Sequence, residues 1–403
     1  MSSRRRQARS PAAGPLNDDD LLSEILLRLS PQPSSLPRAS LVCKRWRSLI
    51  SDPGFFRRFS LRHRHKPPLL GFFDKYDGLS FLSTLGAPNR LPPGRFSLPP
   101  EVDDYRFSLG CRHGLVLLWP VKRFEVVVWD PITCDQHRIA LPPGFNKRDG
   151  AVLRIAGDVQ HFQVVLADTV WDKDVKQHTR ALACVYSSKT GSWGNFISTP
   201  LPYQAHGGSS STWLYDVDAV LVGDSLYWIL SGNFEGILKF DVEKQSLAVI
   251  RAPVDMCGKG NYYRVMRAEG GGLGFLFMSV ADYTAGLWKR KTDCDGVASW
   301  ELGRTIEIDK LLSLKSKDKN PLALGILGFA EQNNVVLIWT IIGIFMIHLE
   351  SSKFKKLFET MTCPHYQPSE SVYRTQYHPF ESVYTTGTCV GVGHDGAELL
   401  VDM

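Results

Sequence analysis

Histidine, cysteine and glycine are the residues of this chain that could form a metal or catalytic site, but their spacing forms none. His63 and His65 lie two positions apart, so on a helix their side chains would point in different directions. His365, His378 and His394 share no ligand-spaced motif, and no His-Glu-x-x-His sequence occurs. The histidines therefore give no support for a metal centre.

The eight cysteines are scattered singly along the chain, and none belongs to a Cys-x-x-Cys pair. Zinc ribbons and RING-type sites need such pairs, so both are disfavoured. Isolated cysteines in a chain of 403 residues are typical of reduced, intracellular proteins. We therefore expect this protein in the cytoplasm and/or the nucleus.

One glycine-rich segment matches the consensus sequence of a nucleotide-binding loop. Gly391-Val392-Gly393-His394-Asp395-Gly396 matches G-x-G-x-x-G, but only seven residues follow it. A crossover helix, a second strand and a ribose-binding acid have no room there. The motif instead predicts a hairpin turn before a last strand at Glu398–Val401. The sequence thus predicts no catalytic residue, no cofactor and no metal.

Positive charge is concentrated in residues 1–66, which hold 14 Lys or Arg and 5 Asp or Glu, whereas the remainder holds 33 and 36. A basic nucleic-acid-binding body is therefore disfavoured. Residues 1–15 are expected to be a disordered basic tail. The longest apolar run, Val335–Ile347, has thirteen residues. Because a membrane span needs roughly twenty, this run predicts two buried strands and no membrane segment.

Residues 16–65 show a helical pattern. Asn17 or Asp18 can cap a first helix, in which apolar residues recur at helical spacing. A proline-rich connection leads to a second apolar stripe, which includes Trp46 and ends at Asp52-Pro53-Gly54. The pattern predicts a small module of three helices.

This module resembles the F-box. The resemblance is carried by residues 16–29 (LNDDDLLSEILLRL) and by residues 41–53 (LVCKRWRSLISDP). It implies that the module binds a Skp-type adaptor. Seven apolar residues are expected to make this contact: Leu16, Leu22, Ile25, Leu26, Leu41, Val42 and Trp46.

The apolar content of the module independently predicts a partner, because three short helices cannot hide so many large side chains. Two alternatives stay open. The surplus apolar residues could pack onto the remainder of the chain, or the module could be a DNA-binding helix-turn-helix. The second is disfavoured because the basic residues flank Trp46 instead of forming one polar face.

Residues 68–403 read as many short strands separated by turn residues. An aromatic or apolar residue followed by a polar turn recurs at Trp129, Tyr186, Phe240, Trp288 and Leu349, with spacings of 57, 54, 48 and 61. Phe73-Asp74 is a candidate sixth copy. A period near 50 residues is typical of kelch-like propellers. The predicted fold is therefore α+β by domain, with an all-β, propeller-like region, and a β-sandwich is the alternative.

An F-box followed by a repeat-built β-domain resembles the substrate receptors of SCF-type cullin ubiquitin ligases, a form abundant in plants. The resemblance implies a non-catalytic role in protein ubiquitination, with a cullin scaffold bound through the adaptor and an unknown target bound by the β-domain. The alternatives are a propeller enzyme and a Skp-binding protein acting outside a ligase. We further expect the strand at Glu398–Val401 to close the β-domain near Leu69–Phe73, and the two parts to function separately.

Overall fold

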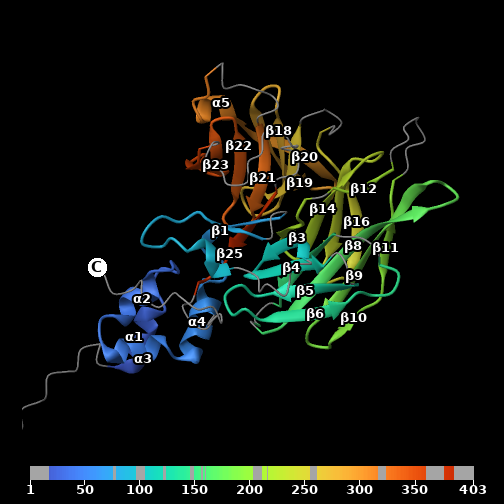
Figure 1. The fold of residues 1–403 in the computed structure, drawn as a ribbon. Helices are drawn as coiled ribbons and strands as arrows, with labels where there is room; N and C mark the ends of the chain where they lie inside the picture. Colours follow the sequence, from blue (N-terminus) through green and yellow to red (C-terminus); the bar gives the residue numbers. More distant parts are fainter. Residues whose placement is uncertain are drawn as a thin grey trace, which may run out of the picture.

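The structure is a computed structural model of the full chain. It describes residues 18–75, 79–96, 105–120, 124–145, 149–155, 158, 160–202, 211–215, 217–254, 261–315, 324–359 and 376–384. The described chain consists of a small helical module beside a larger all-β domain (Figure 1).

The helical module lies within residues 18–66. Its four helices are α1 (Asp19–Leu26), α2 (Ser35–Ser40), α3 (Lys44–Ile50) and α4 (Pro53–His63). The Asp18 carboxylate accepts hydrogen bonds from the backbone N–H of Asp20 and Leu21 and so caps α1.

The expected count of three helices is wrong, because Asp52-Pro53 begins a helix instead of ending one. The Asp52 side chain accepts a hydrogen bond from the Phe55 N–H at 2.8 Å, and Pro53 occupies the first turn of α4. A proline is tolerated there because its missing N–H has no partner in a first helical turn.

The β-domain is a propeller of six sheets among the described residues, which rules out the β-sandwich alternative. Blade 1 contains β25 (Tyr377–Glu381), β1 (Leu69–Asp74) and β2 (Phe81–Ser83), and blade 2 contains β3 (Tyr105–Arg112), β4 (Leu115–Pro120), β5 (Glu125–Trp129) and β6 (Gln136–Ala140). Blade 3 contains β7 (Asp149–Arg154), β8 (Phe162–Asp172), β9 (Gln177–Ser187), β10 (Ser192–Trp193) and β11 (Ile197–Pro200).

The other three blades follow in chain order. Blade 4 contains β12 (Trp213–Leu214), β13 (Val220–Val222), β14 (Ser225–Ser231), β15 (Gly236–Asp241) and β16 (Ser246–Arg251). Blade 5 contains β17 (Tyr262–Arg267), β18 (Leu273–Ser279), β19 (Thr284–Thr292) and β20 (Ala298–Glu307), followed by the short α5 (Ile308–Leu311). Blade 6 contains β21 (Leu324–Ala330), β22 (Val335–Thr340), β23 (Gly343–His348) and β24 (Phe354–Phe358).

The recurring sequence motif marks the third strand of a blade. Its five copies lie in or directly after β5, β9, β15, β19 and β23. Phe73-Asp74 departs from this rule, because it ends β1, which lies between β25 and β2. The 55-residue period therefore reports one blade per repeat, except in the blade that joins the two ends of the domain.

The propeller closes through β25, which pairs antiparallel with β1 in the register Phe73 to His378. The other edge of β1 is paired with β2. The strand that pairs with β1 from the C-terminal part of the chain is therefore β25, where the sequence had suggested Glu398–Val401. Glu398–Val401 itself lies outside the described residues.

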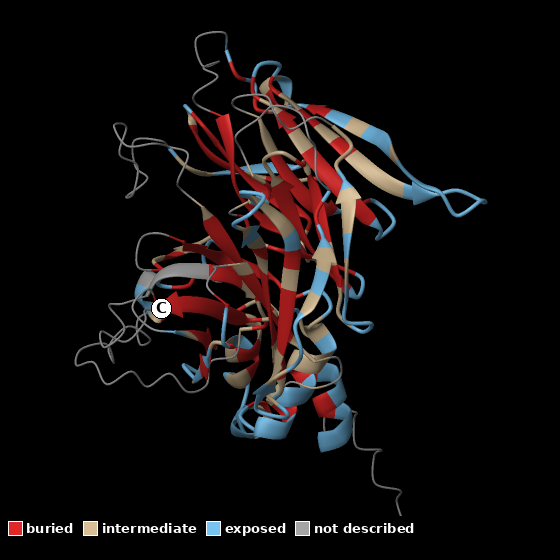
Figure 2. Cartoon of the chain, turned by 90° about the vertical axis from the view of Figure 1, so that its right-hand side faces the viewer, coloured by how far each residue is buried: buried red, intermediate tan, exposed pale blue. Residues whose placement is uncertain are grey.

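Burial follows position within the blades (Figure 2). The middle strands β4 and β22 are buried along their whole length, whereas the outer strand β24 is largely exposed. The apolar run Val335–Ile347 forms the buried strands β22 and β23, as predicted. Within the described residues, no helix is long and apolar enough to cross a membrane.

The two domains share a packed junction. Val383, which follows β25, belongs to the hydrophobic core of the helical module together with Phe55 and Phe59. The Ser34 N–H donates to Asn89 Oδ1 at 3.0 Å across the same boundary. The segment after the closing strand therefore packs against both domains.

Candidate partner-docking surface and central channel

Helix α1 has apolar residues on two faces. Leu22 and Leu26 point inward and are almost completely buried, in the cluster that also holds Phe55 and Phe59. Leu21 and Ile25, four positions apart, keep 50% and 39% of their surface exposed. Because residues four apart lie on one helix face, Leu21 and Ile25 form an outward apolar stripe.

Leu41 and Val42 are a second exposed apolar pair, with 74% and 61% of their surface accessible. They lie between α2 and α3. Arg45, near the start of α3, pairs with the Asp19 carboxylate at 2.7 Å. This ion pair holds the beginning of α3 beside the first turn of α1.

The structure divides the seven residues expected to contact the adaptor. Ile25, Leu41 and Val42 are exposed, and Trp46 is half-buried against the core of the module. Leu22 and Leu26 are core residues, so their side chains are not available at the surface. Leu16 lies outside the described residues. Leu21 was not expected in the contact, although its spacing from Ile25 could have indicated it.

The axis of the propeller carries a second concentration of functional groups. Arg112, on β3, donates from Nη2 to Glu331 Oε2 at 2.8 Å and to the Ala219 carbonyl at 2.6 Å. Glu331 also accepts the Leu221 N–H at 2.9 Å. These bonds join β3 of blade 2 to residues in or beside β13 of blade 4 and β21 of blade 6, and both charged side chains are buried.

His378 and Glu381, both on the closing strand, extend this network. His378 Nδ1 lies 2.6 Å from Asp218 Oδ2. Burial alone would raise the pKa of Asp218, but the charges of His378, Lys75 and Arg264 hold this pKa at about 2. Burial raises the pKa of Glu381 to about 7, against the opposing effect of hydrogen bonds from Asn333.

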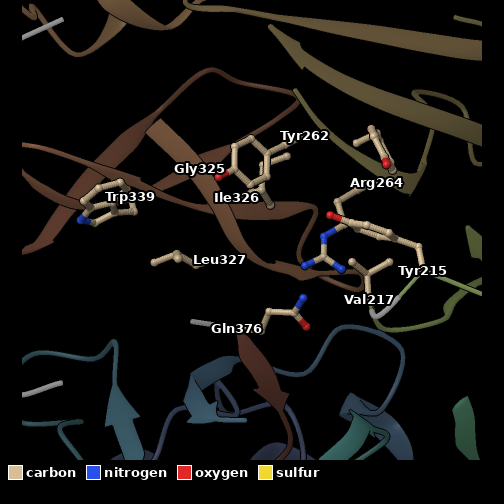
Figure 3. A pocket seen from close by; sticks show the side chains of 10 residues that line it. Tyr215, Val217, Tyr262, Arg264, Gly325, Ile326, Leu327, Trp339 and Gln376 are labelled. Carbon is tan, nitrogen blue, oxygen red and sulfur yellow. The ribbon is translucent and has the colours of Figure 1, made fainter. Parts of the chain in front are cut away.

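Little free space remains between these groups. The void beside Arg112 and Asp218 has a volume of about 20 Å³, and a second void, lined by Arg264 and Gln376 among others, has about 30 Å³. Each holds one or two waters at most. In the second void, the Arg264 guanidinium and the Gln376 amide point toward one another below Tyr262 (Figure 3).

A propeller enzyme would have polar groups converging on the channel to meet a substrate. Polar groups do converge here, but Arg112 and Asp218 are each bonded to a neighbouring side chain. Their geometry is that of cross-links between blades. In the part of the chain that the structure describes, no three His, Cys, Asp or Glu residues are grouped to hold a metal ion.

The cysteines only partly match the expectation of reduced thiols. Cys43, Cys111, Cys184 and Cys294 are free. Cys134 is joined in a disulfide, which their isolated spacing did not predict.

Comparison with protein families gives two matches. Residues 108–380 match the family described as F-box protein AT5G49610-like, beta-propeller. Residues 18–58 match the F-box domain. Together these matches cover the helical module and most of the propeller.

Relatives occur in Arabidopsis thaliana. The F-box protein At3g16210 is 27% identical over 242 residues, which is 59% of this chain and 60% of the relative. The F-box/kelch-repeat protein At1g15680 is 31% identical over 192 residues, which is 43% of this chain and 45% of the relative. The chain therefore matches only about half of the length of these relatives.

Solved structures show weaker likeness. The WD40 domain of SCAP from fission yeast aligns with a TM-score of 0.35 and 11% identity, over 61% of this chain and 49% of that one. The Pseudomonas aeruginosa periplasmic gluconolactonase PpgL aligns with a TM-score of 0.35 and 12% identity, over 59% and 67%. Similarity at this level transfers no activity.

Proposed function

Because the chain belongs to the family of F-box proteins with an AT5G49610-like β-propeller, we propose that it is the substrate receptor of an SCF-type cullin ubiquitin ligase. The F-box binds a Skp-type adaptor, which links it to the cullin scaffold. The propeller binds the target protein. The chain makes and breaks no bonds itself, and it acts by holding the target near the ubiquitin-conjugating enzyme.

The observation that carries this proposal is the exposure of Leu21, Ile25, Leu41 and Val42 on a module that already has its own core. Four exposed large apolar side chains on so small a module indicate a protein partner. Of the residues first expected in the contact, we propose that Ile25, Leu41 and Val42 touch the adaptor directly. Leu22 and Leu26 support the helices from within, and Trp46 contributes through its exposed part.

The test uses the full chain with Leu41→Asp and Val42→Asp together. Both side chains are exposed, so the charges should leave the fold intact while they oppose burial in an apolar interface. Adaptor binding should weaken by about a hundredfold or more, as expected for losing two central apolar contacts. The matched control is Val297→Asp, an equally exposed valine on the β19–β20 turn, which should bind the adaptor normally.

The same variant separates the receptor role from its alternatives. In cells, Leu41→Asp/Val42→Asp should still capture the target, but the captured target should not be ubiquitinated. The target should therefore accumulate when the variant is overexpressed. Adaptor and target partners are identified by affinity purification with the wild-type chain. An unchanged target half-life, with both partners bound to the wild type, would contradict the ligase role and leave an adaptor-binding protein outside a ligase.

A further inference from the structure

A large cavity lies between the F-box and the propeller. It has a volume of about 1200 Å³ and is lined on one side by α4 and on the other by turns of blades 2, 3 and 4 and the end of β25. Small-molecule sites typically have volumes of about 300–1,000 Å³. The cavity is therefore large enough for a ligand that contacts both domains at once. None of the residues proposed to touch the adaptor lines it, and Glu381 is the one ionisable residue of the described channel network that does.

The α4 wall of this cavity is cationic. Arg57, Ser60 and Arg64 line it at helical spacings of three and four residues, which place them on one face. Among the described residues, neither Arg57 nor Arg64 has a hydrogen-bond or ion-pair partner. Their neighbour Arg58 does not line the cavity, and it bonds to Ser23 and Glu24. Arg57 and Arg64 thus present unpaired guanidinium groups to the cavity, whereas Arg62, which also has no partner among the described residues, is exposed and does not line it.

His113 and Arg154 continue the same donor surface on the propeller side. The Arg154 backbone N–H donates to His113 Nδ1, and Arg154 Nε donates to the His113 carbonyl, both at 3.1 Å. Nδ1 therefore accepts, so the ring hydrogen is on Nε2. The pKa of His113 is lowered to about 4. Burial is the largest cause, and the positive charges of Arg112, Arg154 and Arg64 add to it. His113 is thus a neutral donor near three arginines.

The carboxylates nearest to this donor surface already have partners. Asp130 pairs with Arg154 at 2.8 Å and accepts the Ile132 N–H. Glu381 accepts hydrogen bonds from Asn333. Asp224 and Glu243, on the blade 4 wall, have no such side-chain partner in the described part of the chain. A ligand can therefore carry negative charge at the α4 end, but not along the whole cavity.

We propose that the α4 end of this cavity binds the oxyanion group of a small-molecule ligand, a phosphate or a carboxylate. Arg57 and Arg64 supply charge-assisted hydrogen bonds, and Ser60 and His113 supply neutral donors. The remainder of the ligand lies toward Asp224 and Glu243 and is uncharged or cationic. Because the walls belong to different domains, the bound ligand bridges the F-box and the propeller.

The experiment is calorimetric titration of the full chain with inorganic pyrophosphate and, separately, with citrate, at fixed low ionic strength. The test variant is Arg57→Gln/Arg64→Gln. The matched control is Arg62→Gln, which removes an exposed arginine of the same helix that does not line the cavity. Tighter binding of pyrophosphate indicates a phosphate ligand, and tighter binding of citrate indicates a carboxylate.

We expect saturable binding to the wild type and to Arg62→Gln, and binding at least about tenfold weaker to Arg57→Gln/Arg64→Gln. Adaptor binding by all three chains should be equal, which keeps this result separate from the ligase role and shows that the double variant is folded. Absence of saturable binding of both probes to the wild type overturns the proposal. Equal binding by the double variant overturns it as well.

Discussion

Leu22 and Ile25 lie three positions apart on α1, yet one is completely buried and the other is exposed. Leu22→Ala should therefore cost about 2–5 kcal/mol of the stability of the module, because it leaves a cavity in the core. Ile25→Ala should leave stability within about 0.5 kcal/mol of the wild type but weaken adaptor binding. Urea unfolding and adaptor titration measure the two effects. Equal loss of stability in both variants would contradict the division of roles.

Glu381 should make the stability of the propeller depend on pH. Its pKa is about 7 in the folded chain, against an ordinary value of 4.5. Between these values, the folded chain keeps a proton that the unfolded chain has released, so stability falls as pH rises through this window. Glu381→Gln is neutral at every pH and keeps an acceptor oxygen. It should flatten this dependence and gain up to about 3 kcal/mol at pH 8.

Thermal unfolding at pH 5 and pH 8 measures this prediction. Glu331→Gln is the comparison, because it weakens the buried pair with Arg112 and should lower stability at both pH values, by about 3–5 kcal/mol. If Glu381→Gln loses stability between pH 5 and pH 8 as steeply as the wild type, Glu381 is not the group that titrates.

Among the elements, regular strands and helices were predictable, whereas β25 was not. The 55-residue motif indicated the third strand of blades 2 to 6, because aromatic strand ends and polar turns recur there. The sequence of β25 is Tyr377-His378-Pro379-Phe380-Glu381. It contains a proline and two polar residues, His378 and Glu381. Its polar residues are buried because Asp218 and Asn333, from other blades, satisfy them. No local pattern contains that information.

The same limit applied to the candidate sites. The F-box motif located the module expected to bind the adaptor. The structure was needed to show that the Leu22 side chain is buried in the core of the module and that the Leu21 side chain is exposed. The junction cavity was not predicted at all. Arg57 and Arg64 have helical spacing, but nothing local indicates that the turns carrying His113 and Arg154 lie opposite them.

Truncation tests the role of β25. A chain that ends at Gln376 lacks the strand that pairs with β1 and should be insoluble, because the edges of blade 1 are left open. A chain that ends at Tyr384 keeps β25 and Val383 and should unfold cooperatively. Circular dichroism melting and size-exclusion chromatography distinguish them. A soluble, cooperative chain ending at Gln376 would show that closure does not depend on β25.

For the molecule as a whole, the shared junction bears on whether the two halves function independently. Val383 is buried among Leu22, Leu26 and Phe59 of the F-box, although it follows the last described strand of the propeller. A fragment of residues 1–66 lacks this core residue. The expectation that the two parts function separately stays a prediction, and Val383 is the residue through which coupling between them can be measured.

Val383→Asp measures this coupling in the full chain. A carboxylate at this buried position should destabilise the F-box by at least about 2 kcal/mol and weaken adaptor binding, although it lies in the C-terminal part of the sequence. Val297→Asp again serves as the exposed control. Normal adaptor affinity and normal protease resistance of α1 in Val383→Asp would show that the F-box does not need the junction.

The position of Val383 in the sequence also orders events during synthesis. The ribosome makes the F-box helices first, but the residue that completes their core emerges only after all six blades have been translated. A chain that terminates before Val383 lacks this core residue, and we expect its F-box to be less stable and to bind the adaptor more weakly. For the proposed receptor function, we therefore expect adaptor binding to favour chains that have been translated through β25 and Val383.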